Sequence, residues 1–195
     1  MDRLCAVVFC CLLPVLAQAE PIETFKLGWA PFVSPNLSVD DPDGSTDATD
    51  TASALSAVAL FPFGRDDRWM VNVTQYDFTL DASQTDIGQD VQSIAVAGFY
   101  QRRLRLSRYF KPWVGVGPQI EFSDKTARHT VDADGFLAQT FSDQDGMAYA
   151  LGVVASHEWL LSDHIEFGVN AAYLFSIRDA IEGGSLGALV LYRFE

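Results

Sequence analysis

Few residues in this chain have side-chain types that could do chemistry together. Ser156, His157 and Glu158 stand side by side and are the residue types of a hydrolytic triad. His157 and Glu158 also begin the HExxH zinc motif, but Leu161 stands where the second histidine must be. The segment reads as a strand, in which neighbouring side chains point to opposite faces, so His157 cannot share a face with the other two. We therefore expect no catalytic residues here, and interpret His157 as an interfacial side chain beside Trp159.

Three Asp-x-Asp-Gly segments could contact divalent cations. Each resembles a fragment of a calcium loop, but none continues into the full twelve-residue pattern with its terminal glutamate. Turn chemistry is the simpler interpretation, because aspartate accepts backbone N–H groups and glycine supplies positive φ. We expect no catalytic residue, no metal site and no cofactor. Weak collective contact with Mg²⁺ or Ca²⁺ would involve Asp41, Asp43, Asp132, Asp134, Asp143 and Asp145.

The elements that would position these residues are predicted to be strands separated by turn residues. Most are far longer than the roughly 5–6 residues of an average soluble strand. They match the roughly 9–11 residues that a tilted strand needs to cross a membrane. The eight predicted strands are residues 22–32, 52–61, 69–78, 91–102, 112–122, 147–159, 165–176 and 186–194.

Several of these strands alternate large apolar residues with small or polar ones. A narrow membrane barrel turns its large apolar face to lipid and its small and polar face to the lumen. Because successive strand residues alternate faces, the same rule sends charged side chains inward. Buried charges are very costly unless they pair, so we expect an inner network of bases and acids that blocks water-soluble solutes. Its predicted members are Lys26, Glu121, Glu158, Glu166 and Arg193.

The connections alternate in length and charge along the chain. Four connections are predicted to be long: residues 33–51, 79–90, 123–146 and 177–185. Most of their charged residues are acidic, and their basic residues are Lys125, Arg128 and Arg178. Residues 62–68, 103–111 and 160–164 are short. Long outer loops and short periplasmic turns are typical of outer-membrane barrels, so we expect the long connections outside the cell. The short connections and their borders are rich in basic residues: Arg65, Arg68, Arg102, Arg103, Arg105, Arg108 and Lys111.

The first 19 residues have the pattern of a cleaved signal peptide. Arg3 is followed by an apolar run and then by Ala17-Gln18-Ala19, a small-x-small cleavage site. The run is too short for the roughly 20 residues of a membrane-spanning helix. Residues 1–19 are therefore predicted to be a signal peptide, and residues 20–195 a single outer-membrane barrel domain without cysteine.

Two segments carry a resemblance to a known group of proteins. Residues 186–194, Leu-Gly-Ala-Leu-Val-Leu-Tyr-Arg-Phe, resemble the terminal strand by which outer-membrane barrels are recognised for insertion, although Glu195 follows the final aromatic residue. Residues 109–117, Tyr-Phe-Lys-Pro-Trp-Val-Gly-Val-Gly, are similar to a strand of small barrels of the OmpW, OmpA and opacity-protein kind. The resemblance implies an eight-stranded antiparallel up-and-down transmembrane β-barrel in the cell outer membrane, with the barrel-insertion machinery and lipopolysaccharide as partners.

Composition and width limit the possible functions. The net charge of −13 argues against nucleic-acid binding, which needs a basic face. An eight-stranded barrel has room only for its own side chains, so a general diffusion porin is not expected. We expect a non-enzymatic surface protein whose acidic loops serve envelope structure, adhesion or contact with ligands and ions. The alternatives are a narrow channel for small or apolar solutes, as in OmpW-like barrels, a lipid-modifying outer-membrane enzyme, and a soluble lipocalin.

Overall fold

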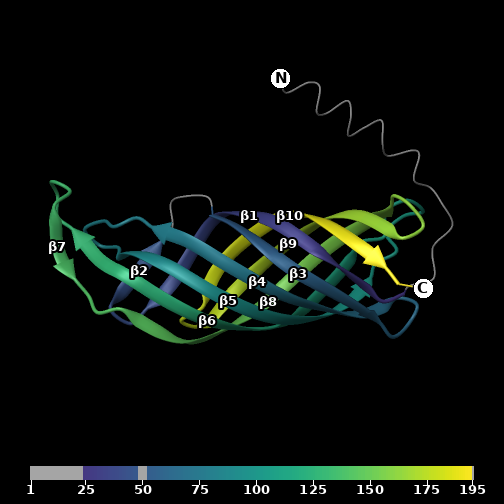
Figure 1. Ribbon diagram of the computed structural model, residues 1–195, viewed down its shortest axis with the longest axis horizontal. Coiled ribbons are helices and arrows are strands. Elements are labelled where there is room, and N and C mark those ends of the chain that lie inside the picture. Colours follow the sequence, from purple (N-terminus) through teal and green to yellow (C-terminus); the bar gives the residue numbers. More distant parts are fainter. Residues whose placement is uncertain (1–23, 48–51, 195) are drawn as a thin grey trace, which may run out of the picture.

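A closed antiparallel barrel is the architecture of the computed structural model, which describes residues 24–47 and 52–194 (Figure 1). The signal-peptide prediction for residues 1–19 lies outside these residues. Within the described chain, eight long strands make the wall: β1 (Lys26–Asp41), β3 (Ala52–Pro62), β4 (Asp67–Leu80), β5 (Gly88–Arg103), β6 (Trp113–Val131), β8 (Gln144–Leu160), β9 (Ile165–Arg178) and β10 (Ile181–Arg193). Two short strands, β2 (Gly44–Asp47) and β7 (Leu137–Thr140), pair with β1 and β6.

The barrel closes where the first strand pairs with the last. Each long strand pairs with its neighbours in the chain, and β1 also pairs with β10, with Lys26 opposite Arg193. The predicted eight-stranded up-and-down barrel is thus confirmed. None of the residues that the structure describes belongs to a helix long and apolar enough to cross a membrane.

The two ends of the barrel differ, and we name them by their connections. The turn end carries the short connections 63–66, 104–112 and 161–164, together with the start of β1 and the end of β10. The loop end carries β2 and β7, and β7 projects beyond the wall (Figure 1). The strands continue well past the predicted boundaries at this end, because β6 reaches Val131 and β8 starts at Gln144.

One predicted long loop is wrong. Residues 177–185 were expected to form a long connection, but β9 and β10 meet in a turn at Asp179 and Ala180. Asp179 has a φ of 52°, a left-handed conformation that aspartate tolerates better than most residues. Glu182 then accepts a hydrogen bond from the backbone N–H of Ser176 across the pair, at 3.3 Å. The polar residues after the turn therefore extend the hairpin instead of forming a loop.

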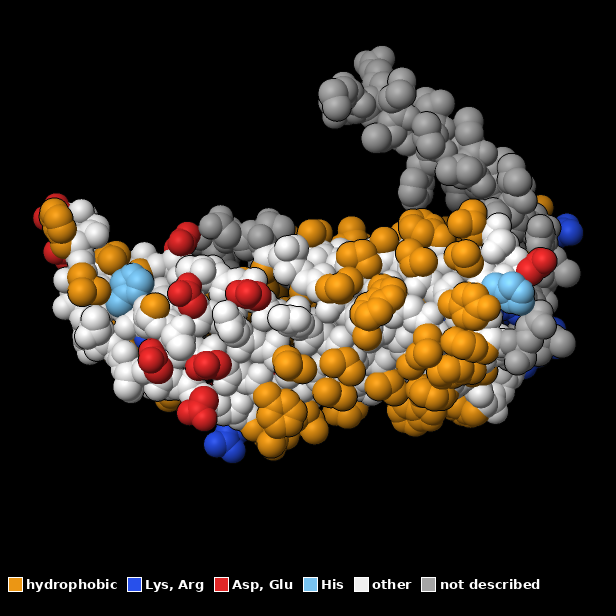
Figure 2. All heavy atoms as spheres, in the orientation of Figure 1, with side chains coloured by type: hydrophobic (Ala, Val, Ile, Leu, Met, Phe, Trp, Pro, Cys, Tyr) orange, Lys and Arg blue, Asp and Glu red, His pale blue; other side chains and the backbone are white. Residues whose placement is uncertain are grey.

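Side chains alternate between the two faces of the wall as the period of a strand requires. In β9, Glu166 is 2% exposed while the next residue, Phe167, is 40% exposed. Figure 2 shows apolar side chains gathered over the middle and the turn end of the visible face, and acidic ones over the loop end. An apolar exterior of this kind is stable against lipid rather than water. The large exposed side chains include Leu27, Trp29, Ile94, Val96, Phe122, Leu151, Val153, Phe167, Tyr173, Phe175, Val190 and Tyr192.

The interior is more apolar than predicted. Small and polar groups were expected to fill the lumen, but two large clusters of buried apolar side chains lie among them, besides a small one of Ala148, Ala150 and Ala180. Phe99 illustrates how they fit: a Cβ on Gly152 would lie 2.7 Å from its ring, so the aromatic group uses the space left by a glycine. The cluster nearer the turn end contains Ala30, Val58, Leu60, Met70, Ala97, Phe99, Val154, Leu189 and Leu191. The other contains Leu37, Val39, Tyr76, Leu80, Val91, Ala95 and Ile181.

Candidate functional site in the lumen

The turn end of the lumen holds a cluster of buried charges from strands far apart in the chain. Lys26 at the start of β1 lies with its Nζ atom 2.8 Å from Glu166 Oε2 and 3.4 Å from Glu158 Oε2. Arg68 of β4 donates to both carboxylate oxygens of Glu158, at 2.5 and 2.8 Å. Each acid thus contacts a base from the opposite part of the chain, and we call these four residues the turn-end cluster.

Arg68 is the centre of this cluster, although its position in the sequence suggested a turn. Its Nε donates to Gln101 Oε1 at 2.6 Å and its Nη2 to Ser156 Oγ at 3.1 Å. The guanidinium also lies 4.0 Å from the ring centroid of Trp113, a cation–π contact. Most donors of Arg68 are therefore used inside the barrel, as a buried guanidinium requires.

Two predicted members of the network lie differently from Lys26, Glu158 and Glu166. Arg193 joins the cluster at its edge, with Nε 3.3 Å from Glu166 Oε1, and its side chain is 15% exposed. Glu121 does not join it. Its Oε2 accepts a hydrogen bond from the N–H of Ile181, at the loop end of β10, at 3.2 Å. Strand parity correctly assigns Glu121 to the inner face, but parity says nothing about height along the barrel.

Burial shows that the turn-end cluster fills the lumen at this level. The side chains of Lys26, Arg68, Glu158 and Glu166 are 2%, 1%, 6% and 3% exposed. Charged groups that lined an open aqueous pore would keep contact with water. These side chains contact one another instead, and the apolar cluster lies next to them along the barrel. The arrangement can therefore hold the two sides of the wall together and exclude water.

A second charge cluster closes the loop end. Arg128 of β6 is 0% exposed at its side chain, and its Nη2 lies 2.6 Å from Asp41 Oδ1 and 2.9 Å from Asp43 Oδ2. Its Nη1 donates to the carbonyl oxygen of Ser142 at 2.5 Å, and its Nε to Gln89 Oε1 at 3.3 Å. One guanidinium thus joins the β1–β2 hairpin, β5 and the chain that leads into β8. We call this group the Arg128 staple.

The candidate cation contacts fall into separate places. Asp41 and Asp43 are held by Arg128, a base where a cation would need to sit. Asp132 accepts the N–H groups of Asp134 and Phe136 at 3.0 and 2.9 Å, the turn chemistry that its sequence suggests. Among the described residues, no group of three or more acidic, histidine or cysteine side chains could hold a metal ion. Asp143 and Asp145 flank the start of β8 and join no such group.

The triad residue types are separated by the wall. Ser156 Oγ lies 3.3 Å from Glu158 Oε1 inside the barrel. His157 points outward, where its ring centroid lies 5.0 Å from that of Phe110 and 4.7 Å from that of Trp159. An imidazole outside the wall cannot accept a proton from a hydroxyl inside it. These three residues therefore do not form a catalytic triad.

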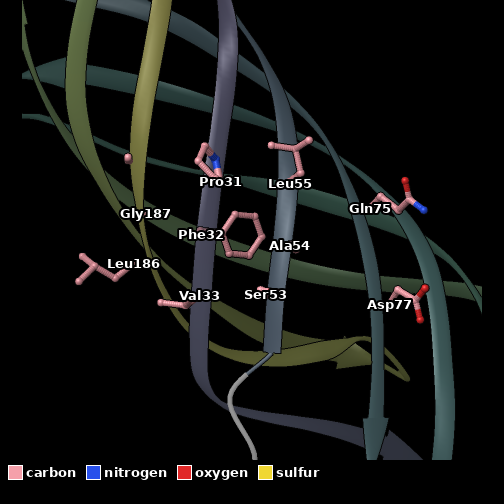
Figure 3. Close-up of a pocket in the computed structure, with 11 residues that line it drawn as sticks. Pro31, Phe32, Val33, Ser53, Ala54, Leu55, Gln75, Asp77, Leu186 and Gly187 are labelled. Carbon is pink, nitrogen blue, oxygen red and sulfur yellow. The ribbon is translucent and has the colours of Figure 1, made fainter.

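A pocket of about 660 Å³ opens in the wall between β1, β3, β4 and β10 (Figure 3). The pairing of β1 with β10 shifts register between Val33 and Asn36, beside the pocket. Its lining combines outward side chains such as Leu55 and Leu186 with Phe32, which packs against the loop-end apolar cluster. The pocket is thus a hollow of the lipid-facing wall that reaches a side chain of the core.

Comparison with known proteins supports the same class. No family model matches the sequence, and no curated protein matches it. Among solved structures, the outer membrane protein OprG from Pseudomonas aeruginosa is 11% identical, with 91% of this chain and 98% of that chain covered and a TM-score of 0.62. Neisserial surface protein A (NspA) is 16% identical, with coverages of 90% and 100% and a TM-score of 0.52. Ail of Yersinia pestis is 15% identical, with coverages of 88% and 99% and a TM-score of 0.52.

The chain is therefore an eight-stranded barrel of the outer-membrane type, and its apolar exterior belongs in a bilayer. Its fold is that of OprG, NspA and Ail, small barrels of the kind that the sequence resembles. At these identities the likeness concerns the fold alone.

Sequence reasoning missed Arg68 and Arg128 as interior residues, and it left the face of Trp113 open. A signal existed for two of them. The predicted strand begins at residue 69. If it is begun at Arg68 instead, Arg68 falls on the same inward face as Met70. Trp113 shares its parity with Gly115 and Gly117. Arg128 had none, because residues 123–146 were expected to form a loop without strand alternation.

Proposed function

We propose that this chain is a non-enzymatic outer-membrane surface protein whose barrel is closed to water-soluble solutes. The observation that carries the proposal is the pair of buried charge clusters at the two ends of the lumen. Lys26, Arg68, Glu158 and Glu166 fill the turn end, and the Arg128 staple ties the loop end together. Side chains that fill the lumen at the turn end favour a role carried by the outer surface. The separation of His157 from Ser156 supports the absence of hydrolytic activity.

The proposed working surface is the loop end, which we assign to the outside of the cell. The support is the charge division between the two ends, since long, acidic outer connections and short periplasmic turns are typical of these barrels. Lipopolysaccharide is the lipid that this end would meet. Divalent cations are the natural bridge between its phosphates and exposed carboxylates such as Asp124, Asp134 and Asp145. Envelope structure and adhesion are both compatible with such a surface.

Conductance in planar lipid bilayers tests the proposal. We expect the refolded barrel to insert without steady ionic current, and liposomes that carry it not to swell in small sugars. Insertion is checked on the same samples by the shift in gel mobility that a folded barrel shows before boiling. A variant with Lys26, Arg68, Glu158 and Glu166 all replaced by alanine is the matched comparison, because its turn end is emptied. Steady current through the unmodified barrel would overturn the proposal.

A narrow path for apolar solutes is the second candidate, and the wall pocket favours it. The pocket is lined by Phe32, which packs against the loop-end apolar cluster, so an apolar molecule held in the pocket would lie beside the core of the barrel. Filling the pocket by Leu55→Trp should then slow the uptake of an apolar fluorescent probe into liposomes. Leu151→Trp, at an exposed wall position on β8, is the control. Equal uptake by the two variants would eliminate this candidate.

A further inference from the structure

The connection between β5 and β6 at the turn end combines basic and apolar side chains in an ordered turn. Leu106 is 65% exposed and Tyr109 70% exposed, and Arg108 stands between them with its guanidinium 5.7 Å from the tyrosine ring centroid. Ser107 orders the reversal: its Oγ accepts the N–H groups of Tyr109 and Phe110 at 3.2 and 2.9 Å. The exposed side chains are therefore presented by a fixed backbone. We call residues 104–111 the basic turn.

The basic turn lies against the outer wall of the barrel. Phe110 packs on His157, an outward side chain of β8, with ring centroids 5.0 Å apart. Further round the wall, Phe63, Trp69 and Tyr100 form an aromatic group with centroids 5.8–6.4 Å apart. Aromatic groups of this kind mark the level of the lipid headgroups in a membrane barrel. The basic turn is therefore continuous with the lipid-facing surface, at headgroup level.

Charge decides which lipid fits this surface. Arg102 follows Tyr100 on the outer face of β5 and is 66% exposed, with its Nε 3.8 Å from Asp67 Oδ1. The nearby acids are already engaged, since Asp66 accepts two hydrogen bonds from Arg105 at 2.8 Å and Asp67 accepts one from the hydroxyl of Tyr100 at 2.6 Å. Bases outnumber acids in the three short connections and the residues that border them: Arg65, Arg102, Arg103, Arg105, Arg108 and Lys111 stand against Asp66, Asp67 and Asp163. The net charge of these connections is therefore positive, whereas the net charge of the whole chain is −13.

We infer that the basic turn binds the headgroups of anionic phospholipids in the leaflet at the turn end. Arg102 and Arg108 supply the charges for the headgroup phosphate, while Leu106 and Tyr109 insert beside the acyl chains. A basic residue at an anionic membrane surface contributes about fivefold in affinity, and the contribution falls with salt. The partner is thus a lipid such as phosphatidylglycerol, in the leaflet opposite to the one that the loop end contacts.

The test uses the refolded full barrel in nanodiscs. Brominated phosphatidylglycerol or brominated phosphatidylcholine is mixed with its unbrominated form, and quenching of tryptophan fluorescence gives the relative affinity of each lipid for the protein surface. Trp69 and Trp159 lie at the turn end and report on this leaflet. We expect a preference for phosphatidylglycerol. Arg108→Gln should reduce the preference about fivefold, Arg102→Gln with Arg108→Gln should reduce it further, and Arg108→Lys should preserve it.

Arg178→Gln is the matched control, because Arg178 is 73% exposed but lies at the loop end. This substitution removes the same charge but leaves the basic turn unchanged. The lipid preference of the Arg178→Gln variant should therefore equal that of the unmodified protein. The inference is overturned if the unmodified protein shows no preference for phosphatidylglycerol, or if Arg178→Gln and Arg108→Gln lower the preference equally. The inference is also overturned if Arg108→Gln keeps its lipid preference but no longer co-sediments with purified peptidoglycan. That result would assign the surface to a different partner.

Discussion

Replacement of Arg68 by methionine tests the turn-end cluster most directly. The variant loses both hydrogen bonds to Glu158, the bond to Gln101 and the contact with Trp113, and it leaves Glu158 with Lys26 at 3.4 Å as its remaining ion-pair partner. Breaking a buried ion pair by removing one partner costs about 3–5 kcal/mol, because an uncompensated charge stays buried. We expect a loss of that size in the free energy of unfolding.

Two comparison variants make this expectation specific. Arg193→Met removes a partly exposed pair at 3.3 Å, so it should cost only about 1 kcal/mol. Arg68→Met combined with Glu158→Met removes both charges and keeps the volume, so the double variant should be much more stable than Arg68→Met alone. Urea titration of barrels folded in phospholipid vesicles, followed by tryptophan fluorescence, measures all three. The reasoning fails if Arg193→Met is as damaging as Arg68→Met, or if the double variant gains nothing over the single one.

Three further predictions concern the wall, a close approach and the topology. Val153→Arg turns a charge toward lipid midway along β8 and should cost about 2–4 kcal/mol, whereas Ile177→Arg at the loop end should cost little; the same urea titration compares them. Gly117→Ala should destabilise by about 1–3 kcal/mol because its methyl group would collide with the carbonyl oxygen of Gly98, while Gly146→Ala meets open space, and unequal thermal unfolding is the readout. An epitope inserted at Ala133 should be reached by antibody on intact cells and one at Arg65 should not; the reverse labelling would invert the topology.

The sequence was sufficient for the architecture because strand alternation is a strong local signal. Strand number, antiparallel order and the outward face of residues such as Phe167 all follow from a period of two, and the structure has them. The ends of strands were less predictable. Beyond the bilayer the alternation of large and small residues fades, so β6 and β8 were predicted too short, and the hairpin at Asp179 was taken for a loop.

The interior could be predicted only in part, for a geometric reason. Parity says which face a residue occupies, and it places Lys26, Glu158 and Glu166 inside. Parity gives no height, but position along the strands predicts that Glu158, Glu166 and Arg193 lie nearest the periplasmic side, apart from Glu121. Parity cannot act on a residue assigned to a turn, as Arg68 was. The apolar clusters were missed because residues such as Phe99 fit the lumen only where a facing glycine makes space, and that pairing is a property of the closed barrel.

The order of the chain gives the turn-end cluster a consequence for assembly. Lys26 and Arg68 belong to the first half of the polypeptide, whereas Glu158 and Glu166 come near its end, and β1 finds its last neighbour only in β10. An unfinished chain therefore carries two cations with no carboxylate to neutralise them, and moving such charges into hydrocarbon is costly. Insertion of the early strands is penalised until the late strands arrive. We therefore expect a product truncated before β8 to enter the bilayer less readily than the full chain, because Lys26 and Arg68 would lack the carboxylates of Glu158 and Glu166.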